Sequence, residues 1–219
     1  MNQNTNPSFN LSCGLLHLPS PPESYKAIDW YTSPIAGLPF LLRNIISLQR
    51  AGLHELIIYI ETSQEQIDTL ALAIKEDSRV LAKTQWASNS KQLKESLHNR
   101  KNKVLVFNGS TLYDKKTIRS ISKVFIQQEA TTSTTLPISK DELEILIEKI
   151  QCNDANELID IQDQIPSFAY ISGPVAANVK EKKDFSIQHE RLLAGSGQNH
   201  DSSITRLLSR PVSQKMTRF

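Results

Sequence analysis

Two short runs of nearly continuous apolar residues constrain the fold more than any other feature of this 219-residue chain. The first, "ELIIYI", covers residues 55–60, and the second, "KVLVF", covers residues 103–107. Strands of this kind are usually buried on both faces of a parallel sheet, and parallel strands are joined by crossover helices. The runs therefore predict an α/β fold. We expect four of their side chains to be buried in adjacent or nearby parallel strands: Ile57, Ile58, Leu105 and Val106.

Helix-like and strand-like segments alternate along the rest of the chain, with short connections. Further strands are predicted within residues 11–18, 79–86, 123–127 and 167–171. Helices are predicted from residue 38 to 51, from 64 to about 75, and over residues 90–97, 115–121 and 141–150. This order predicts a three-layer α/β/α sandwich with a mostly parallel sheet.

Several helix ends have recognisable signals. Gly52 lies where a glycine commonly ends a helix in the left-handed conformation. Ser63 with Gln66, and Ser139 with Glu142, have the spacing of a capping box. Asp114 is positioned to cap the segment 115–121.

Composition excludes several classes of protein. The formal net charge of +2 is too small to indicate nucleic-acid binding. Cys13 and Cys152 are far apart and form no CxxC pair, so neither a disulfide framework nor a zinc site is expected, and a reducing, cytoplasmic setting fits best. The five histidines show no metal-binding spacing. No apolar run reaches the roughly 18 residues of a membrane span, and the start of the chain lacks a signal-peptide pattern.

The end of the chain differs in character from the rest. We expect a disordered tail at 1–10, one domain at 11–190, and a linker followed by a basic amphipathic helix at 191–219, with a joint at Gly195 to Gly197. Apolar residues recur at helical spacing in this last segment. The basic residues that accompany them are Arg206, Arg210, Lys215 and Arg218. Such a helix suits the surface of an anionic membrane.

The segment 33–60, "SPIAGLPFLLRNIISLQRAGLHELIIYI", resembles the part of nucleotidyltransferases that follows their glycine-rich loop. Residues 103–121 are similar to the strand, loop and helix that carry the metal-binding aspartate of that family. The segment 191–219 resembles the linker and juxtamembrane helix of CDP-alcohol phosphatidyltransferases with an N-terminal nucleotidyltransferase domain, which include enzymes that make CDP-inositol and a di-inositol phosphodiester. This resemblance implies a Rossmann-like nucleotidyltransferase fold and a membrane domain in the same polypeptide.

The chain departs from that family at three places that handle phosphate charge. The first strand is followed by "HLPSPPESYK", which has no glycine to let backbone amides approach a phosphate. Trp30 stands where the family has a lysine, and Lys26 is out of register. Ser110 stands where the family has its metal-binding aspartate, and a neutral hydroxyl is a poor Mg²⁺ ligand.

The resemblance also points to candidate site residues. Gly37 and Pro39 would border the base and ribose pocket, although a tight turn before a helix is the simpler interpretation. Arg43 is a candidate phosphate ligand, but a solvated helix residue is the alternative that we favour. Ser110 and Asp114 are candidate metal ligands, with Asp114 as a displaced substitute or only a helix cap.

Three functions remain open at this point. The first is a degenerate nucleotidyltransferase-like domain with a structural or regulatory role, for which we expect no cofactor. It would lie at the cytoplasmic face of the membrane, and a homodimer is possible in this case. The second is an active sugar- or polyol-phosphate cytidylyltransferase that makes a CDP-alcohol from CTP and needs Mg²⁺. The third is a free-standing α/β binding module with no membrane partner.

Overall fold

The computed structural model describes residues 13–22, 24–98, 100, 104–113, 118, 138–152, 168–170 and 177–196. Several expectations lie outside these residues: the disordered tail at 1–10, Asp114 as a cap, the strand at 123–127 and the basic helix near the end of the chain. Within the described part of the chain, no helix is both long and apolar enough to span a membrane.

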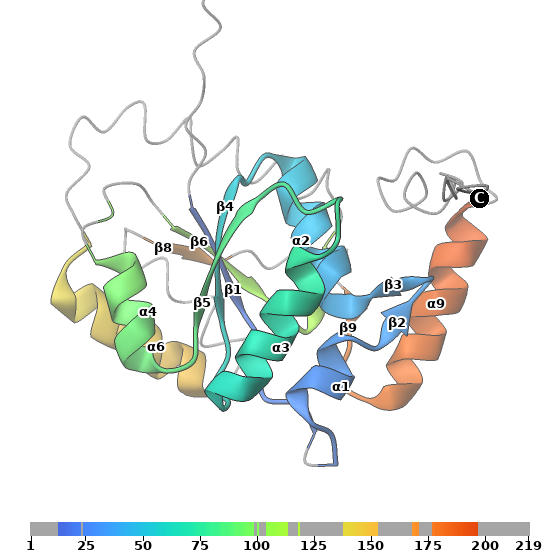
Figure 1. Ribbon diagram of the computed structural model, residues 1–219, viewed down its shortest axis with the longest axis horizontal. Helices are drawn as coiled ribbons and strands as arrows, with labels where there is room; N and C mark the ends of the chain where they lie inside the picture. Colours follow the sequence, from blue (N-terminus) through green and yellow to red (C-terminus); the bar gives the residue numbers. More distant parts are fainter. Residues whose placement is uncertain are drawn as a thin grey trace, which may run out of the picture.

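A parallel sheet forms the centre of the fold, in the strand order β5-β4-β1-β6-β8. Its strands are β1 (Cys13–His17), β4 (Glu55–Tyr59), β5 (Lys83–Ala87), β6 (Val104–Asn108) and β8 (Phe168–Tyr170). Every neighbouring pair in this sheet is parallel. The carboxyl ends of the strands all point to the lower side of Figure 1. The expected mostly parallel sheet is confirmed.

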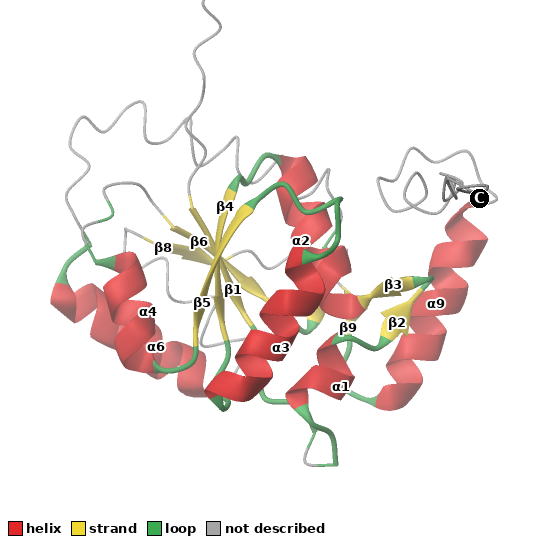
Figure 2. Cartoon of the chain, in the orientation of Figure 1, coloured by secondary structure: helices red, strands yellow, loops and turns green. Residues whose placement is uncertain are grey.

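Helices cover both faces of the sheet, as Figure 2 shows. On one face lie α2 (Phe40–Ala51) and α3 (Gln64–Lys75), and on the other lie α4 (Ser90–Leu97) and α6 (Lys140–Cys152). Alternate residues of β1 point to opposite faces of the sheet. Leu16 packs in the cluster under α2 and α3, and Leu15 packs in the cluster under α4 and α6. The expected three-layer α/β/α sandwich is confirmed.

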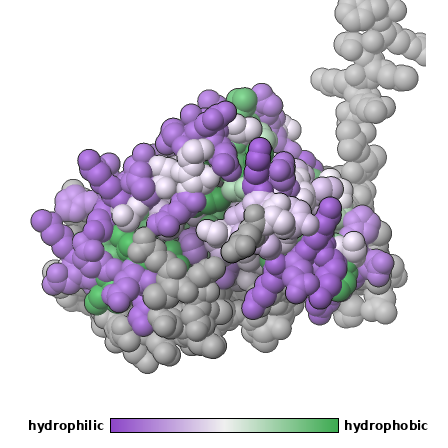
Figure 3. Space-filling view, turned by 90° about the horizontal axis from the view of Figure 1, so that it is seen from below, coloured by the Kyte–Doolittle hydropathy of each residue, from purple (hydrophilic) through white to green (hydrophobic). Residues whose placement is uncertain are grey.

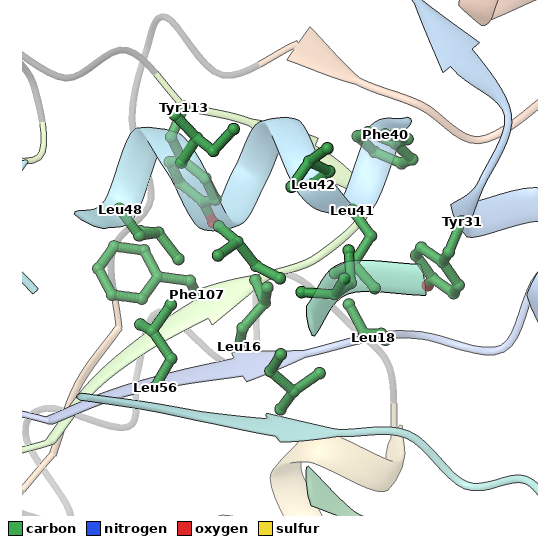
Figure 4. Close-up of a cluster of buried hydrophobic side chains, with 14 of the residues drawn as sticks. Leu16, Leu18, Tyr31, Phe40, Leu41, Leu42, Leu48, Leu56, Phe107 and Tyr113 are labelled. Carbon is green, nitrogen blue, oxygen red and sulfur yellow. The ribbon is translucent and has the colours of Figure 1, made fainter. Parts of the chain in front are cut away.

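Both apolar runs are buried, as their composition predicts. Ile57, Ile58, Leu105 and Val106 are each at most 1% exposed. They do not lie on adjacent strands, because β1 lies between β4 and β6 and pairs with both. Figure 4 shows Leu16, Leu56 and Phe107 from these three strands in one cluster beneath α2.

The helix ends agree with the sequence at two places and differ at two others. Gly52 ends α2 with φ 110°, as expected. Ser139 and Glu142 form a reciprocal capping box, in which each backbone N–H donates to the side chain of the other. The second capping box is wrong: Ser63 makes no side-chain capping bond, and only its carbonyl accepts from the Gln66 N–H. The predicted start of α2 is also wrong, since Leu38 lies in a short strand and the helix begins at Phe40.

A smaller group of elements packs beside α2, at the right of Figure 1. It contains α1 (Ala27–Tyr31), the hairpin of β2 (Pro34–Ile35) and β3 (Leu38–Pro39), and α9 (Lys182–Ser196). A separate two-stranded sheet pairs β7 (Thr111–Leu112) with β9 (Ala177–Asn178). Phe185 of α9 packs edge-to-face on Trp30 and Phe40, with ring centroids 4.9 and 5.6 Å apart. Helix α9 continues through residue 190, so it crosses the expected domain boundary and includes Gly195 of the expected joint.

Candidate functional site

The strand order identifies where a ligand site belongs in this fold. The chain moves outward from β1 to β4 and β5, and then returns to the other side of β1 to form β6. In open parallel sheets, ligands bind outside the carboxyl ends of the strands at such a reversal. Figure 3 views the molecule from this side, where hydrophilic residues predominate and hydrophobic ones appear only in small separate areas. The candidate site is therefore the space at the ends of β1 and β6.

The two loops at this point are in direct contact. The Gly109 N–H donates to the His17 carbonyl at 2.6 Å. A Cβ atom at position 109 would lie 2.3 Å from Leu18 Cδ2 and 2.8 Å from the His17 oxygen, so glycine is required for this close approach. Leu18 itself is only 1% exposed. The side chain that follows β1 thus fills the space against the loop that follows β6.

Tyr31 closes the same space from the side of α1. It is fully buried, and its hydroxyl donates to the Pro19 carbonyl at 2.5 Å. Burial raises the pKa of Tyr31, and a side-chain hydrogen bond with Ser110 partly opposes this rise. Figure 4 shows Tyr31 and Leu18 next to each other at one end of the apolar cluster. Tyr31 therefore holds the loop after β1 through the Pro19 carbonyl.

The loop after β1 offers few backbone donors. Pro19, Pro21 and Pro22 have no N–H. The Leu18 N–H already donates to the Tyr59 carbonyl at 2.8 Å. Among residues 18–22, only Ser20 has a backbone N–H that is neither missing, as in proline, nor donated to a carbonyl in the described part of the chain. A loop that holds phosphate needs several converging amides, and the described stretch 18–22 offers only the one of Ser20.

Asn44 adds a buried polar group beneath the same loops. Its side-chain amide donates to the Gly109 carbonyl at 2.9 Å, and the residue is 1% exposed. Its Oδ1 has no hydrogen-bond partner among the described residues. Asn44 therefore helps fix the loop after β6 from the first turns of α2.

Arg43 is not the solvated helix residue that the sequence suggested. It is fully buried, and its guanidinium donates to the Ile35 carbonyl at 2.5 and 3.1 Å and to the Ala36 carbonyl at 3.0 Å. Burial lowers the pKa of Arg43 to about 10, with a smaller contribution from Arg79. Its Nη1 has no partner within the described residues. Arg43 thus holds the β2–β3 hairpin in place from within the core.

Gly37 and Pro39 belong to that hairpin. Ala36 and Gly37 have φ values of 46° and 76°, which is the left-handed backbone of a tight two-residue hairpin turn. Gly37 is exposed, and Pro39 is the residue before the first turn of α2. The structure brings neither residue to the loop contact between Leu18 and Gly109.

The described residues at the end of β6 do not fit a Mg²⁺ ion. Ser110 supplies only a neutral hydroxyl, which is a poor Mg²⁺ ligand. The Asn108 side-chain oxygen already accepts from the Ser110 N–H at 2.8 Å. No group of three or more His, Cys, Asp or Glu side chains suited to a metal occurs within the described part of the chain. Asp114, Arg206, Arg210, Lys215 and Arg218 lie outside the described residues.

Solved structures share this arrangement of elements, although no protein-family model and no curated protein matches the sequence. A putative glucose-1-phosphate thymidylyltransferase from Bacillus anthracis, in complex with sucrose, aligns with a TM-score of 0.55 and 9% identity over 82% of this chain and 94% of that one. Rv0371c of Mycobacterium tuberculosis, crystallised with manganese, gives 0.53 and 14% over 82% and 98%. The 4-diphosphocytidyl-2C-methyl-D-erythritol synthase of Anaerococcus prevotii gives 0.50 and 8% over 84% and 99%.

The fold is that of the nucleotidyltransferases. At these identities the likeness shows the fold alone. Within this nucleotidyltransferase fold, sequence reasoning missed three buried residues at the strand ends: His17, Tyr31 and Asn44. His17 could have been found, because a polar residue at the end of an otherwise apolar first strand is a usable signal. Tyr31 and Asn44 gave none, because no element was expected around Tyr31 and Asn44 looks like an ordinary polar residue of the helix expected from residue 38.

Proposed function

We propose that this chain is the nucleotidyltransferase-like domain of a CDP-alcohol phosphatidyltransferase, and that its role is structural or regulatory. In this proposal the domain retains the fold without transferring nucleotides. It would lie at the cytoplasmic face of the membrane, joined to a C-terminal membrane domain of the same polypeptide. The homodimer expected from the sequence belongs to the same proposal.

The proposed loss of nucleotide transfer rests mainly on the contact between Leu18 and Gly109. A nucleotide at the strand-order reversal needs open space above the ends of β1 and β6. Leu18 and Tyr31 occupy that space and are buried. Admitting a triphosphate there requires displacement of both side chains and exposure of apolar surface to water, at about 25 cal/mol per Å².

Charge supports the same proposal. A triphosphate carries several negative charges, and catalysis of its transfer depends on positioning and on neutralising that charge. Arg43 directs its guanidinium to two backbone carbonyls, and the loop after β1 offers few amides. The described residues at the site therefore provide little to hold phosphate.

The link to a membrane enzyme rests on the resemblance of residues 191–219. Helix α9 adds a physical reason for such a link, because it leads from the domain toward that segment and is anchored at its start. Phe185 packs against Trp30 and Phe40, and His189 accepts a hydrogen bond from Ala36. In this proposal, a force on the tail or a change in its orientation would reach the β2–β3 hairpin through α9.

Calorimetric titration with CTP, with and without Mg²⁺, tests the nucleotide part of the proposal. We expect no binding heat, and no pyrophosphate release above a no-protein control when CTP is mixed with inositol phosphate or glycerol phosphate. A cytidylyltransferase of known activity serves as the positive control. Saturable CTP binding together with pyrophosphate release would instead establish the active cytidylyltransferase as the function.

The variant Ser110→Asp sharpens this test, because it restores the carboxylate that the related family has. We expect no gain of turnover, since Leu18 and Tyr31 still fill the crevice and the loop after β1 still lacks amides. Turnover in this variant would mean that one missing carboxylate was the whole defect.

Flotation with anionic vesicles tests the membrane part. We expect the full chain to bind and to bind less at high salt, since each Lys or Arg near such a surface contributes about 1 kcal/mol. Changing Arg206, Arg210, Lys215 and Arg218 to Gln should abolish binding. The matched control changes four exposed lysines of the domain to Gln: Lys75, Lys91, Lys140 and Lys180. Equal loss in both variants would remove the case for a membrane-facing tail.

A further inference from the structure

The strand β5 forms one edge of the central sheet. It pairs with β4 on one side, and no strand of the described part of the chain lies on its other side. Figure 1 shows β5 in front of the other strands, between α3 and α4. The outer backbone groups of an edge strand can pair with another strand. β5 is therefore a place where the sheet can be extended.

Hydrogen bonds at the two ends of β5 show which of its backbone groups face outward. The Lys83 N–H donates to the carbonyl of the residue before β4 at 2.8 Å, and the Ala87 carbonyl accepts from the N–H of the residue after β4 at 3.1 Å. Backbone groups of successive residues point to opposite sides of a strand, so Lys83, Gln85 and Ala87 bond with β4. The N–H and carbonyl groups of Thr84 and Trp86 therefore point outward, and they have no partner among the described residues.

Two glutamine side chains limit this open stretch to two residues. Before β5, the Gln49 Oε1 atom accepts from the Ala82 N–H at 2.9 Å. After β5, the Gln92 Oε1 atom accepts from the Ser88 N–H at 2.7 Å. The donors of the next outward-facing residues are thus already satisfied. A partner strand meets two donors and two acceptors, placed symmetrically on either side of Gln85.

This symmetry suits a second copy of the same chain. With a two-fold axis beside Gln85, Thr84 of each copy lies opposite Trp86 of the other in an antiparallel pair, and every open group is bonded. A β-branched residue opposite an aromatic one stabilises neighbouring strands. Trp86 is only partly buried against the cluster under α2 and α3, so it has surface left for this contact. Tryptophan is also enriched at protein interfaces.

The charges on β5 permit this pairing. Lys83 is the one charged residue of the strand, and a lysine on an edge strand often prevents association. In the two-fold register it lies opposite the neutral Ala87 of the other copy. The two Lys83 residues are then about 14 Å apart along the strands, which exceeds the screening length of about 8 Å at physiological salt. Gln85, which is also neutral, lies opposite itself.

We propose that two copies of this chain associate through β5, in antiparallel pairing about Gln85, so that their sheets join into one continuous sheet. This inference rests on the homodimer of the proposed function and names its surface. It does not depend on the loss of nucleotide transfer, because β4 separates β5 from the ends of β1 and β6.

Sedimentation equilibrium of the full chain at several concentrations tests the dimer. We expect a reversible equilibrium between monomer and dimer. Thr84→Pro should raise the dissociation constant at least about tenfold, because it removes an outward N–H whose bond occurs twice in the dimer. Thr84→Val keeps this N–H and the β-branched shape, so it is the matched control and should dimerise like the parent. A parent that stays monomeric would overturn the proposal and the homodimer, whereas titration with CTP would still decide the nucleotide part of the proposed function.

Gln85 gives the decisive test, because only in this register does it meet its own copy. It is exposed, so its variants should fold even if Thr84→Pro does not. Gln85→Lys should raise the dissociation constant about two- to fivefold, since like charges directly opposite are destabilising. Gln85→Ala, which also loses the bond to Ser96, is its control.

A mixture of the variants Gln85→Lys and Gln85→Glu should recover the affinity of the parent, because opposite charges then face each other across the two-fold axis. An unchanged dissociation constant in Gln85→Lys would overturn the proposal, since the dimer would then use another surface. Failure of the mixture to recover would overturn it as well, because residue 85 would not face its own copy.

Discussion

The Nδ1 atom of His189 accepts a hydrogen bond from the backbone N–H of Ala36 at 3.1 Å, although 153 positions separate the two residues. This bond attaches the middle of α9 to the tight turn of the β2–β3 hairpin. On the inner side of the same turn, the Ala36 carbonyl accepts from the Arg43 guanidinium. Both backbone groups of Ala36 are therefore held by side chains from different helices.

Replacing His189 with Ala should free the turn without unfolding the sheet. A typical intramolecular hydrogen bond contributes about 1 kcal/mol, so the loss of unfolding free energy should be about that size. Amide hydrogen exchange should accelerate at Ala36 and remain unchanged in β4. Glu190→Ala, which changes the exposed neighbour, is the control. Unchanged exchange at Ala36 would show that α9 does not hold the turn.

The core of the sheet should respond to truncation far more than its surface. Ile58 is fully buried in β4, so Ile58→Ala should cost about 2–5 kcal/mol in unfolding free energy. Leu72 on α3 is 57% exposed, so Leu72→Ala should stay within about 0.5 kcal/mol. Chemical denaturation of both variants measures the difference. Similar costs for the two changes would place β4 outside the core.

The sheet and its helices were predictable from the sequence because local patterns specify them. The apolar runs at β4 and β6 and the glycine at position 52 depend only on neighbouring residues. The prediction of a capping box at Ser63 was wrong, because two matching residues do not show whether their side chains turn toward each other's backbone N–H groups. Gln66 Oε1 is instead buried, with no partner among the described residues.

The candidate sites were less predictable, because their partners are distant in sequence. Arg43 is buried only because the β2–β3 hairpin brings two carbonyls to it, and residues 34–39 look like a simple turn in the sequence. His17 lies beside the Tyr59 ring because β1 pairs with β4. Strand order and register set such contacts, and neither is visible in a local pattern.

The buried His17 should make stability depend on pH. Its pKa falls from 6.5 to about 4 on folding, so the unfolded chain binds more protons between these values. Stability is therefore fully present above about pH 6.5 and falls as the pH drops toward 4, by on the order of 3 kcal/mol. Urea unfolding at several pH values from 4.5 to 7.5 measures this dependence.

The variant His17→Gln separates this effect from the titration of carboxylates, which both proteins share. The variant should be less sensitive to pH across that window, whatever its stability at pH 7.5. His54→Gln, at an exposed position, should keep the full dependence of the parent. Parallel curves for the parent and His17→Gln would show that the imidazole ionises as readily in the folded state as in the unfolded one.

The contact between Leu18 and Gly109 supports the last prediction. Gly109→Ala would place a methyl group 2.3 Å from Leu18 Cδ2 and 2.8 Å from the His17 carbonyl oxygen. Overpacking of this kind costs about 1–3 kcal/mol. Adding Leu18→Ala should recover only part of the loss, because the His17 carbonyl is backbone and remains. A double-mutant cycle should therefore give a coupling energy of about 0.5–3 kcal/mol.

Gly37→Ala is the matched control for that cycle. A Cβ at position 37 meets nothing within 4 Å, but the backbone there has φ +76°. Its cost of about 1–2 kcal/mol should come from the left-handed backbone alone and should not couple to Leu18. If Gly109→Ala is neutral and uncoupled, the loops after β1 and β6 are not in contact. The crevice would then be open, and the proposed loss of nucleotide binding would lose its main support.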